Sequence, residues 1–292
     1  MAEDKQDSLP ASGGSCSLSS SEKTYSDGTD AGAEGVVSAK LNDNYYPRRY
    51  KKMQCIIFNI RKFYHLNEEE IENTEDVQRL KLTLESIGFI CTYYENKEAW
   101  ELYDILQKLA KSNDDLAQTD GFLCWIITHG DEHTLHASDR ALELDSILKP
   151  FAGDKCPGLF GKPKLFFVQA MNKTSKSICV ADAYGGPASE PDIPCRIPAM
   201  ADFYLAFSSA PGFFESGDEE DLSHFVKMVT KVLKEHVPQD PVQVDLSSLM
   251  ARIVDETRGY FVGAKGRSGL LCYQLPCAMS TLTRHVTFSK LR

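Results

Sequence analysis

Apolar and polar residues alternate along the chain in two different periods from residue 53 onward. Short apolar runs, typical of buried strands, are separated by stretches whose apolar residues recur three or four positions apart, as in amphipathic helices. Strands are expected at residues 53–60, 89–94, 121–128, 165–170, 201–212 and 269–280, and helices at 75–88, 99–113, 143–151, 220–236 and 245–257. This alternation predicts an α/β fold, a mostly parallel sheet flanked by helices on both faces.

Two segments lack these patterns. Residues 1–45 are rich in Ser, Gly, Asp and Ala, with almost no aromatic or branched apolar side chains, so they bury too little apolar surface to become ordered. Residues 183–198 contain Gly and Pro throughout, which predicts an exposed loop. We therefore expect a disordered tail, and one folded domain divided by a linker into a larger N-terminal and a smaller C-terminal part.

Charge and cysteine content narrow the class of protein. The formal net charge of the 292 residues is −10, so neither nucleic acid nor a membrane is expected as a partner. The basic cluster at residues 48–52 is interpreted as the solvent-exposed flank of the first strand. No apolar run approaches the roughly 20 residues of a membrane span, and the N-terminus has no signal-peptide pattern. A cytoplasmic location with nine reduced cysteines is expected.

The densest group of histidines lies in the stretch "THGDEHTLH", which contains His129, His133 and His136. A zinc site is unfavourable here, because His133 and His136 would point to opposite faces of a strand and neighbours do not complete a tetrahedral ligand set. The following residues are typical of a hairpin that turns at Ser138 and Asp139. No metal or cofactor is therefore expected, whereas His129 is expected to face the crevice at the carboxyl edge of the sheet.

The apolar run 165–170 is followed at that same edge by Met171. Loops just past central strands are where α/β proteins place reactive residues. A methionine thioether, however, has no proton to exchange and no nucleophilic oxygen or thiolate. The position is that of an active site, but the residue is not a catalytic one.

Four segments identify a family. "GFLCWIITHGDE", "GKPKLFFVQA", "IPAMADFYLAFSSAPGF" and "LPCAMSTLTRHVTF" resemble the caspases and occur in that family's order, over a similarity that extends from about Tyr46 to the C-terminus. The short N-terminal segment is similar to that of effector caspases, and insect caspases give the best match. The resemblance implies a caspase-like sheet of six strands. It also implies four parts: a prodomain at 1–45, a large-subunit-like region at 46–182, a linker at 183–198 and a small-subunit-like region at 199–292.

The resemblance also implies a catalytic arrangement. Caspases carry a nucleophilic cysteine directly after Gln-Ala, a histidine followed by glycine, and backbone N–H groups that hold the oxyanion. In this chain the histidine and glycine match His129 and Gly130, but the cysteine position is Met171. Cys179, eight residues further on, is too far away in the chain to replace the nucleophile, because a displacement of about 1 Å already costs about 10²-fold in rate.

The aspartate-binding residues of the family are likewise incomplete. The glutamine of that pocket matches Gln169. The two arginines match Glu70, to within two residues, and Gly217, which lies in the acidic run 215–221. Loss of both guanidinium groups removes the bidentate bonds to a substrate carboxylate.

We therefore expect a catalytically inactive caspase homologue that regulates apoptosis by forming a heterodimer with an active paralogous caspase, more in keeping with enhancement than with inhibition. The partner could instead be a second copy of this chain. The alternatives are a dominant-negative inhibitor, a decoy that sequesters a caspase inhibitor, adaptor or substrate, and a residual peptidase. The expected dimer-interface residues, by analogy with the family, are Leu271, Tyr273, Leu275, Cys277 and Met279, and the possible processing sites are Asp182 and Asp27.

Overall fold

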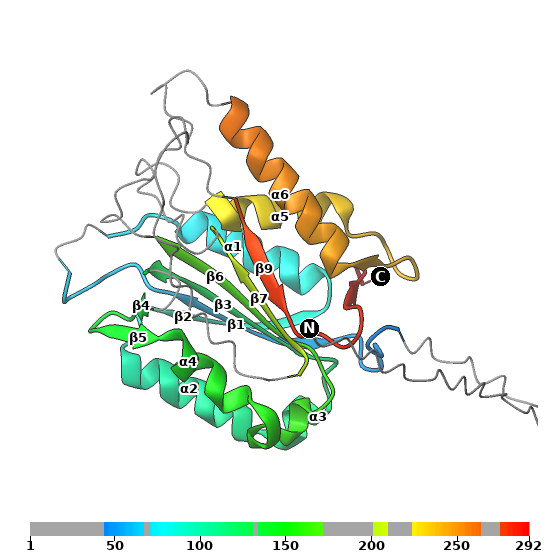
Figure 1. Ribbon diagram of the computed structural model, residues 1–292, viewed down its shortest axis with the longest axis horizontal. Coiled ribbons are helices and arrows are strands. Elements are labelled where there is room, and N and C mark those ends of the chain that lie inside the picture. The colour runs from blue at the N-terminus through cyan, green and yellow to red at the C-terminus, as the bar shows by residue number, and fades with distance from the viewer. Residues whose placement is uncertain are drawn as a thin grey trace, which may run out of the picture. The chain divides into compact units, whose positions relative to one another are not determined.

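The computed structural model describes residues 44–66, 70–130, 134–171, 201–209, 224–263 and 275–291. Its centre is a six-stranded sheet with the strand order β2-β1-β3-β6-β7-β9 (Figure 1). These strands are β1 (Met53–Asn59), β2 (Phe89–Glu95), β3 (Phe122–His129), β6 (Lys164–Met171), β7 (Phe203–Phe207) and β9 (Cys277–Ser280). All neighbours are parallel except β7 and β9, which are antiparallel. The predicted fold class is confirmed.

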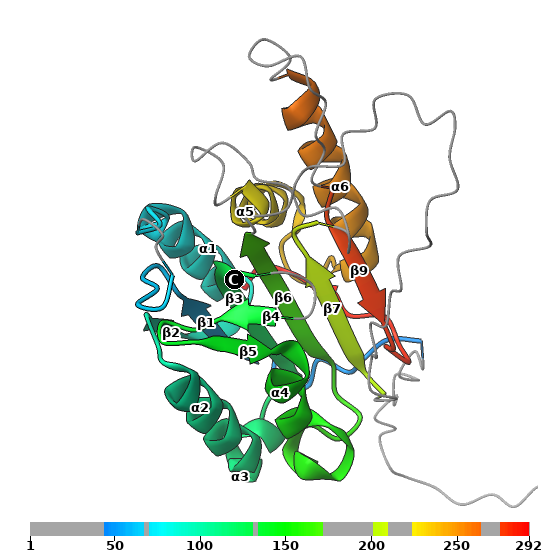
Figure 2. The ribbon, with the colours of Figure 1, turned by 60° about the vertical axis from the view of Figure 1, so that its left-hand side comes forward.

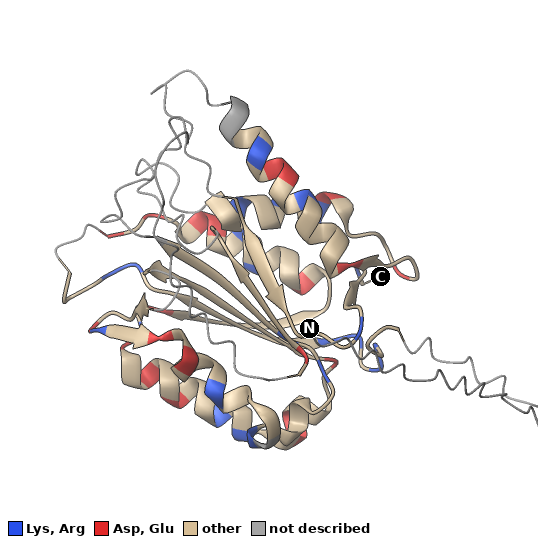
Figure 3. Ribbon diagram, viewed as in Figure 1, with Lys and Arg blue, Asp and Glu red and all other residues tan. Residues whose placement is uncertain are grey.

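Helices cover the two faces of the sheet (Figure 2). They are α1 (Thr74–Ser86), α2 (Ala99–Lys111), α3 (Asn113–Ala117), α4 (Leu144–Leu148), α5 (His224–His236) and α6 (Leu246–Gly263). The helices α1, α5 and α6 pack on one face, and α2, α3 and α4 on the other, each set contributing to its own apolar cluster. Lys, Arg, Asp and Glu lie mainly on the helices and loops (Figure 3).

Smaller elements complete the fold. An antiparallel hairpin, β4 (Thr134–His136) and β5 (Ala141–Glu143), follows β3, as predicted for that stretch. A second antiparallel pair joins β8 (Val244–Asp245) to β10 (Thr287–Phe288), and three single-turn 3₁₀ helices lie at Lys149–Phe151, Gly153–Lys155 and Pro157–Leu159.

The strand β3 explains why the sheet is covered on both sides. Every one of its eight residues is buried, and its side chains alternate between the two apolar clusters. On one face Trp125 packs against Phe167, with ring centroids 5.0 Å apart, and on the other Phe122 stacks on Phe151 at 4.6 Å. Each large side chain buried in this way contributes about 1.5–3 kcal/mol to the free energy of unfolding.

The first helix follows its predicted apolar face. Val77, Leu80 and Leu84 are buried, and the chain leaves the helix through Gly88 at φ +98°. A Cβ atom at Gly88 would lie 2.7 Å from the carbonyl oxygen of Lys51, so this turn requires glycine both for its backbone angle and for its space.

Three predicted boundaries differ from the structure. The helix expected at 99–113 is broken, since α2 ends at Lys111 and α3 starts at Asn113. The second C-terminal helix is longer than expected and reaches Gly263. Within the described residues, the last strand begins only at Cys277. Its ladder cannot extend through Pro276, which has no backbone N–H to donate.

A buried hydrogen-bond network joins the two ends of the described domain. The Tyr46 hydroxyl donates to Oδ1 of Asp202 at 2.6 Å, and the Thr283 hydroxyl donates to the same oxygen at 2.6 Å. The backbone N–H of Thr283 donates to the Tyr46 oxygen at 3.0 Å. Burial, and then the hydrogen bond to Asp202, raise the pKa of Tyr46 to about 12.

Candidate functional site

The carboxyl ends of β3 and β6 form the predicted edge of the sheet. In the parallel ladder between them, His129 is the register partner of Met171, and Ile127 is the partner of Gln169. The backbone therefore places the histidine and the methionine side by side on adjacent central strands. The side chain of Met171 lies outside the described residues.

The imidazole of His129 is buried, with 4% of the residue exposed. It packs against the ring of Phe63, which lies 4.5 Å away between centroids and is itself buried. Phe63 follows β1, so the loop after the first strand holds the histidine at the edge of the sheet. Sequence reasoning missed this aromatic contact, because nothing in the pattern around Phe63 links it to β3.

Gly130 turns the chain from β3 toward the β4–β5 hairpin. Its φ is +153°, and it forms an isolated antiparallel bridge with Leu135. A Cβ atom here would lie 2.3 Å from the carbonyl oxygen of Thr134. The close approach of the hairpin backbone therefore requires glycine directly after the histidine.

The two described histidines of the stretch 129–136, His129 and His136, do not converge on one point. His136 lies beside His65, with Nδ1 of His136 2.8 Å from Nε2 of His65 and the rings 5.1 Å apart. His129 packs instead on Phe63, and His133 lies outside the described residues. His65 is a neighbour that the sequence did not indicate, because it comes from the loop after β1.

Gln169 is buried, with 2% exposed, and its side chain joins the sheet to a helix. The backbone N–H of Val226, in the first turn of α5, donates to Oε1 of Gln169 at 3.0 Å. A buried amide oxygen bonded in this way is fixed in orientation, and it satisfies one of the N–H groups that a helix start leaves open.

The predicted position of one lost arginine, Glu70, lies in an ionic cluster around Arg61. The Arg61 guanidinium contacts carboxylate oxygens of Glu70 at 2.9 Å, Glu72 at 2.7 Å and Glu95 at 2.7 Å. Its Nε–H donates to the carbonyl oxygen of Ile71 at 2.7 Å. Burial lowers the pKa of Arg61, but the hydrogen bond to Glu95 and the three negative charges outweigh it and raise the pKa overall.

The contacts of this cluster occupy the Arg61 guanidinium. The side chain of Arg61 is 12% exposed, and its guanidinium is already bonded to carboxylates on different segments. A further carboxylate from a peptide would have to displace one of these partners. Sequence reasoning did not identify Arg61, although the acidic run that begins at residue 68 was a signal that a cation should lie nearby.

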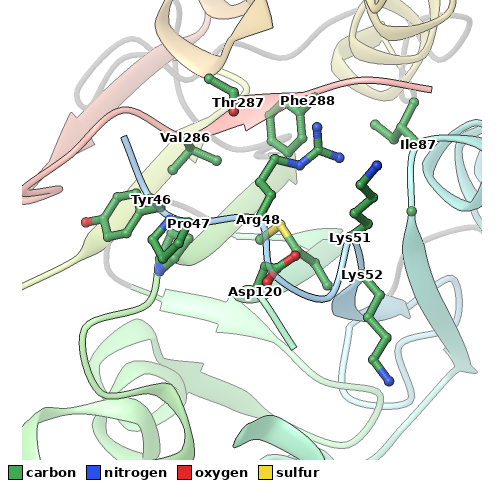
Figure 4. A pocket seen from close by; sticks show the side chains of 13 residues that line it. Tyr46, Pro47, Arg48, Lys51, Lys52, Ile87, Asp120, Val286, Thr287 and Phe288 are labelled. Carbon is green, nitrogen blue, oxygen red and sulfur yellow. The ribbon is translucent and has the colours of Figure 1, made fainter. Parts of the chain in front are cut away.

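A small cavity lies at the other end of the strands, where β1, β2, β3 and β6 begin (Figure 4). Its volume is about 20 Å³, enough for one water molecule but not for a peptide side chain. Part of the predicted basic cluster lines it and is less exposed than expected. Arg48 donates to the Ser289 hydroxyl at 2.6 Å, burial lowers its pKa, and Lys51 pairs with Asp240 at 2.9 Å. These contacts hold the residues just before β1 against the C-terminal part of the domain.

The described part of the expected dimer interface lies in the outermost strand β9 and at Leu275, two residues before it. Leu275, Cys277 and Met279 are each partly exposed, and Cys277 and Met279 pack against the apolar cluster on the α2 face. Leu271, Tyr273, Gly217, Asp182 and Asp27 lie outside the described residues, as do most of the tail 1–45 and the linker 183–198.

A family model of the caspase domain matches residues 52–287 of the chain. The chain belongs to the caspase family. Caspase-3 of Oryctolagus cuniculus is 28% identical over 261 residues, covering 88% of this chain and 91% of that protein. Caspase-1 of Spodoptera frugiperda is 29% identical over 253 residues, covering 85% and 83%.

Solved caspase structures share the fold. The crystal structure of caspase-1 from Spodoptera frugiperda superposes with a TM-score of 0.69 at 28% sequence identity, covering 86% of this chain and 95% of that one. The expected resemblance to caspases is confirmed by these matches. Among the described residues, no helix has both the length and the apolar character to cross a bilayer.

Proposed function

We propose that this chain is a caspase homologue without peptidase activity of its own, which regulates an active paralogous caspase by heterodimerisation. The observation that carries the proposal is the residue at the end of β6. Met171 is the register partner of His129, and the resemblance to caspases matches it to the nucleophilic cysteine of that family. A thioether cannot form a thiolate, so no covalent acyl-enzyme can form at this position.

The charges near the expected aspartate pocket support the same proposal. Glu70 stands at or within two residues of the place of one specificity arginine and pairs with Arg61 and Lys62, at 2.9 and 3.3 Å. Gly217 matches the other arginine. A substrate aspartate would meet acidic groups instead of two free guanidinium groups, and like charges oppose binding.

Three of the five described cysteines are poorly suited to replace the nucleophile. Cys55, Cys124 and Cys156 are buried, and burial raises the pKa of each thiol. A raised pKa keeps sulfur in the unreactive thiol form at neutral pH. Cys277, on β9, donates its thiol to the carbonyl oxygen of Ser209 at 3.7 Å.

An edge strand supports association with another chain. β9 ends the sheet and is paired with β7 along one side, while among the described strands nothing pairs with its other side. Unpaired strand edges favour pairing with a partner. Enhancement of the partner follows if the heterodimer orders the partner's active-site loops, whereas a dominant-negative effect follows if the heterodimer displaces a productive homodimer.

Co-expression with active caspases of the same cell tests the proposal. The purified mixtures are separated by mass in solution, and the rate of peptide cleavage is compared with that of each caspase alone. Co-elution with a raised rate supports the proposal, and co-elution with a lowered rate assigns the dominant-negative role. If no caspase co-elutes and no rate changes, the heterodimer proposal is wrong. Binding of an inhibitor or adaptor without a caspase would instead favour the decoy.

A further inference from the structure

A cluster of metal-ligating side chains lies between α5 and α6. Glu235 and His236 are the last two residues of α5, and Glu256 lies in α6. One ligand atom from each of these three side chains lies within 4.8 Å of the other two. The cluster is at the C-terminal end of α5, whereas the bond from Val226 to Gln169 is in the first turn of the same helix.

Two features suit this cluster to an ion. His236 and Glu256 are partly buried and line a surface cavity of about 230 Å³ together with Asp255, so a ligand can enter from solvent. Within the described part of the chain, the side chains of Glu235 and His236 make no hydrogen bond or ion pair. Among the described residues, Glu256 pairs with the ammonium of Lys231 at 2.7 Å.

We propose that Glu235, His236 and Glu256 form a site for Zn²⁺. One imidazole and two carboxylates are a ligand set that zinc accepts, and three protein ligands leave a fourth tetrahedral position for water from the cavity. Calcium and magnesium prefer sites made of oxygen alone, so the imidazole selects against them. This site is independent of the proposed loss of peptidase activity.

The geometry requires only a small adjustment. Two ligands on one zinc ion can be at most about 4.2 Å apart, twice a bond of about 2.1 Å. The three ligand atoms lie within 4.8 Å of one another, and Glu235 is exposed at the end of its helix, where its side chain can rotate. The bound ion joins the C-terminal end of α5 to α6, in addition to the apolar contacts of Val232 and Ile253 in the core.

Lys231 allows a test in which the zinc affinity should rise. Its ammonium is bonded to Oε2 of Glu256 and repels an incoming cation, so it competes with zinc. Lys231→Met keeps the aliphatic stem and removes the charge. The zinc affinity of this variant should therefore rise a few-fold. Zinc bound elsewhere on the surface would not bind more tightly after this substitution.

The experiment is zinc titration by calorimetry of the full chain without a polyhistidine tag. We expect one ion at this site, at least about tenfold weaker binding in His236→Ala and in Glu256→Gln, and tighter binding in Lys231→Met. Matched controls are His285→Ala, at a histidine outside the site, and Glu85→Gln, a helical glutamate paired with Lys81 at 3.7 Å. Both controls should bind as the wild type does.

Cobalt(II) separates this site from cysteine binding, because thiolate ligands give an intense near-ultraviolet charge-transfer band and a histidine-carboxylate site does not. The expected spectrum has weak visible bands that disappear in His236→Ala. Absence of zinc binding by the wild type would overturn the proposal. So would wild-type affinity in both His236→Ala and Glu256→Gln, or a cobalt spectrum that contains only the thiolate signal. Circular dichroism of each variant establishes that it is folded.

Discussion

His129 and Met171 are register partners at the carboxyl ends of two adjacent parallel strands. The strand on each side is fixed by a buried apolar core, so this relationship follows from the fold and not from a mobile loop. An imidazole that could accept a proton thus lies beside a residue that has none to give. The caspase fold is retained, and the proposed loss of peptidase activity rests on the methionine at this position.

Met171→Cys alone is not expected to restore cleavage after aspartate. The new thiol would stand next to His129, but Glu70 and Gly217 would still replace the two guanidinium groups that bind the substrate carboxylate. The measurement is hydrolysis of an Asp-containing fluorogenic peptide, with alkylation of the new thiol to show that Cys is accessible. Hydrolysis by this single variant would show that the aspartate pocket is intact after all.

A charge on the last strand should separate the two candidate functions. Leu275→Glu is expected to abolish co-elution with an active caspase and any change in its rate, because Leu275 lies two residues before Cys277, the first residue of β9. Binding of a caspase inhibitor or adaptor by a decoy would persist. Ile90→Glu, on the opposite edge strand β2 and 47% exposed, is the control and should leave the heterodimer unchanged. If both substitutions reduced co-elution equally, β9 would not be the specific interface.

Substitution of two glycines by alanine should change the free energy of unfolding in opposite directions. Gly130→Ala brings a methyl group to 2.3 Å from the Thr134 carbonyl oxygen at φ +153°, and should lower the free energy of unfolding by about 1–3 kcal/mol. Gly259→Ala, in α6 with nothing within 4 Å, should raise it by about 0.5–1 kcal/mol. Urea denaturation of both variants measures the difference. A neutral Gly130→Ala would mean that the β4 backbone does not approach this residue closely.

The Tyr46 network predicts a loss of stability at alkaline pH. The pKa of Tyr46 is about 12 in the fold and about 10 in the unfolded chain, so the folded state holds the proton more tightly and stability falls as pH rises from about 10 to about 12. Tyr204, also raised to about 12 by burial, adds the same trend.

Tyr46→Phe isolates the contribution of one hydroxyl. This variant should be less stable than the wild type at neutral pH, because Asp202 loses a buried hydrogen bond, and its stability should depend less steeply on pH above about 10. Tyr64→Phe, at a position 73% exposed, should match the wild type throughout. Urea midpoints at about pH 9 and about pH 11 provide the comparison. A pH dependence unaltered in Tyr46→Phe would contradict the raised pKa.

Much of the fold could be predicted because each element has a local signal. The apolar run of β3 is buried on both faces, and the spacing of Val77, Leu80 and Leu84 matches the buried side of α1. The boundaries were less predictable. Pro276 interrupts the last apolar run, and its effect on the β9 ladder depends on where that strand pairs with β7.

The site was predictable only where its residues end strands. His129 and Gln169 could be placed because the carboxyl ends of parallel strands share one edge. The contacts that hold the site could not, since Phe63, Arg61 and Val226 come from segments far away in the sequence. The proposed zinc site could not be predicted for the same reason, because Glu256 is 20 residues beyond His236 in the sequence and belongs to another helix.

The most direct test is to measure hydrolysis of Asp-containing peptides by the purified full chain, alone and at high protein concentration, with a thiol-directed inhibitor in a parallel sample. We predict no turnover in either sample, because the register partner of His129 is Met171, which carries no thiol. Turnover by the pure chain that the inhibitor abolishes would contradict the proposed loss of peptidase activity.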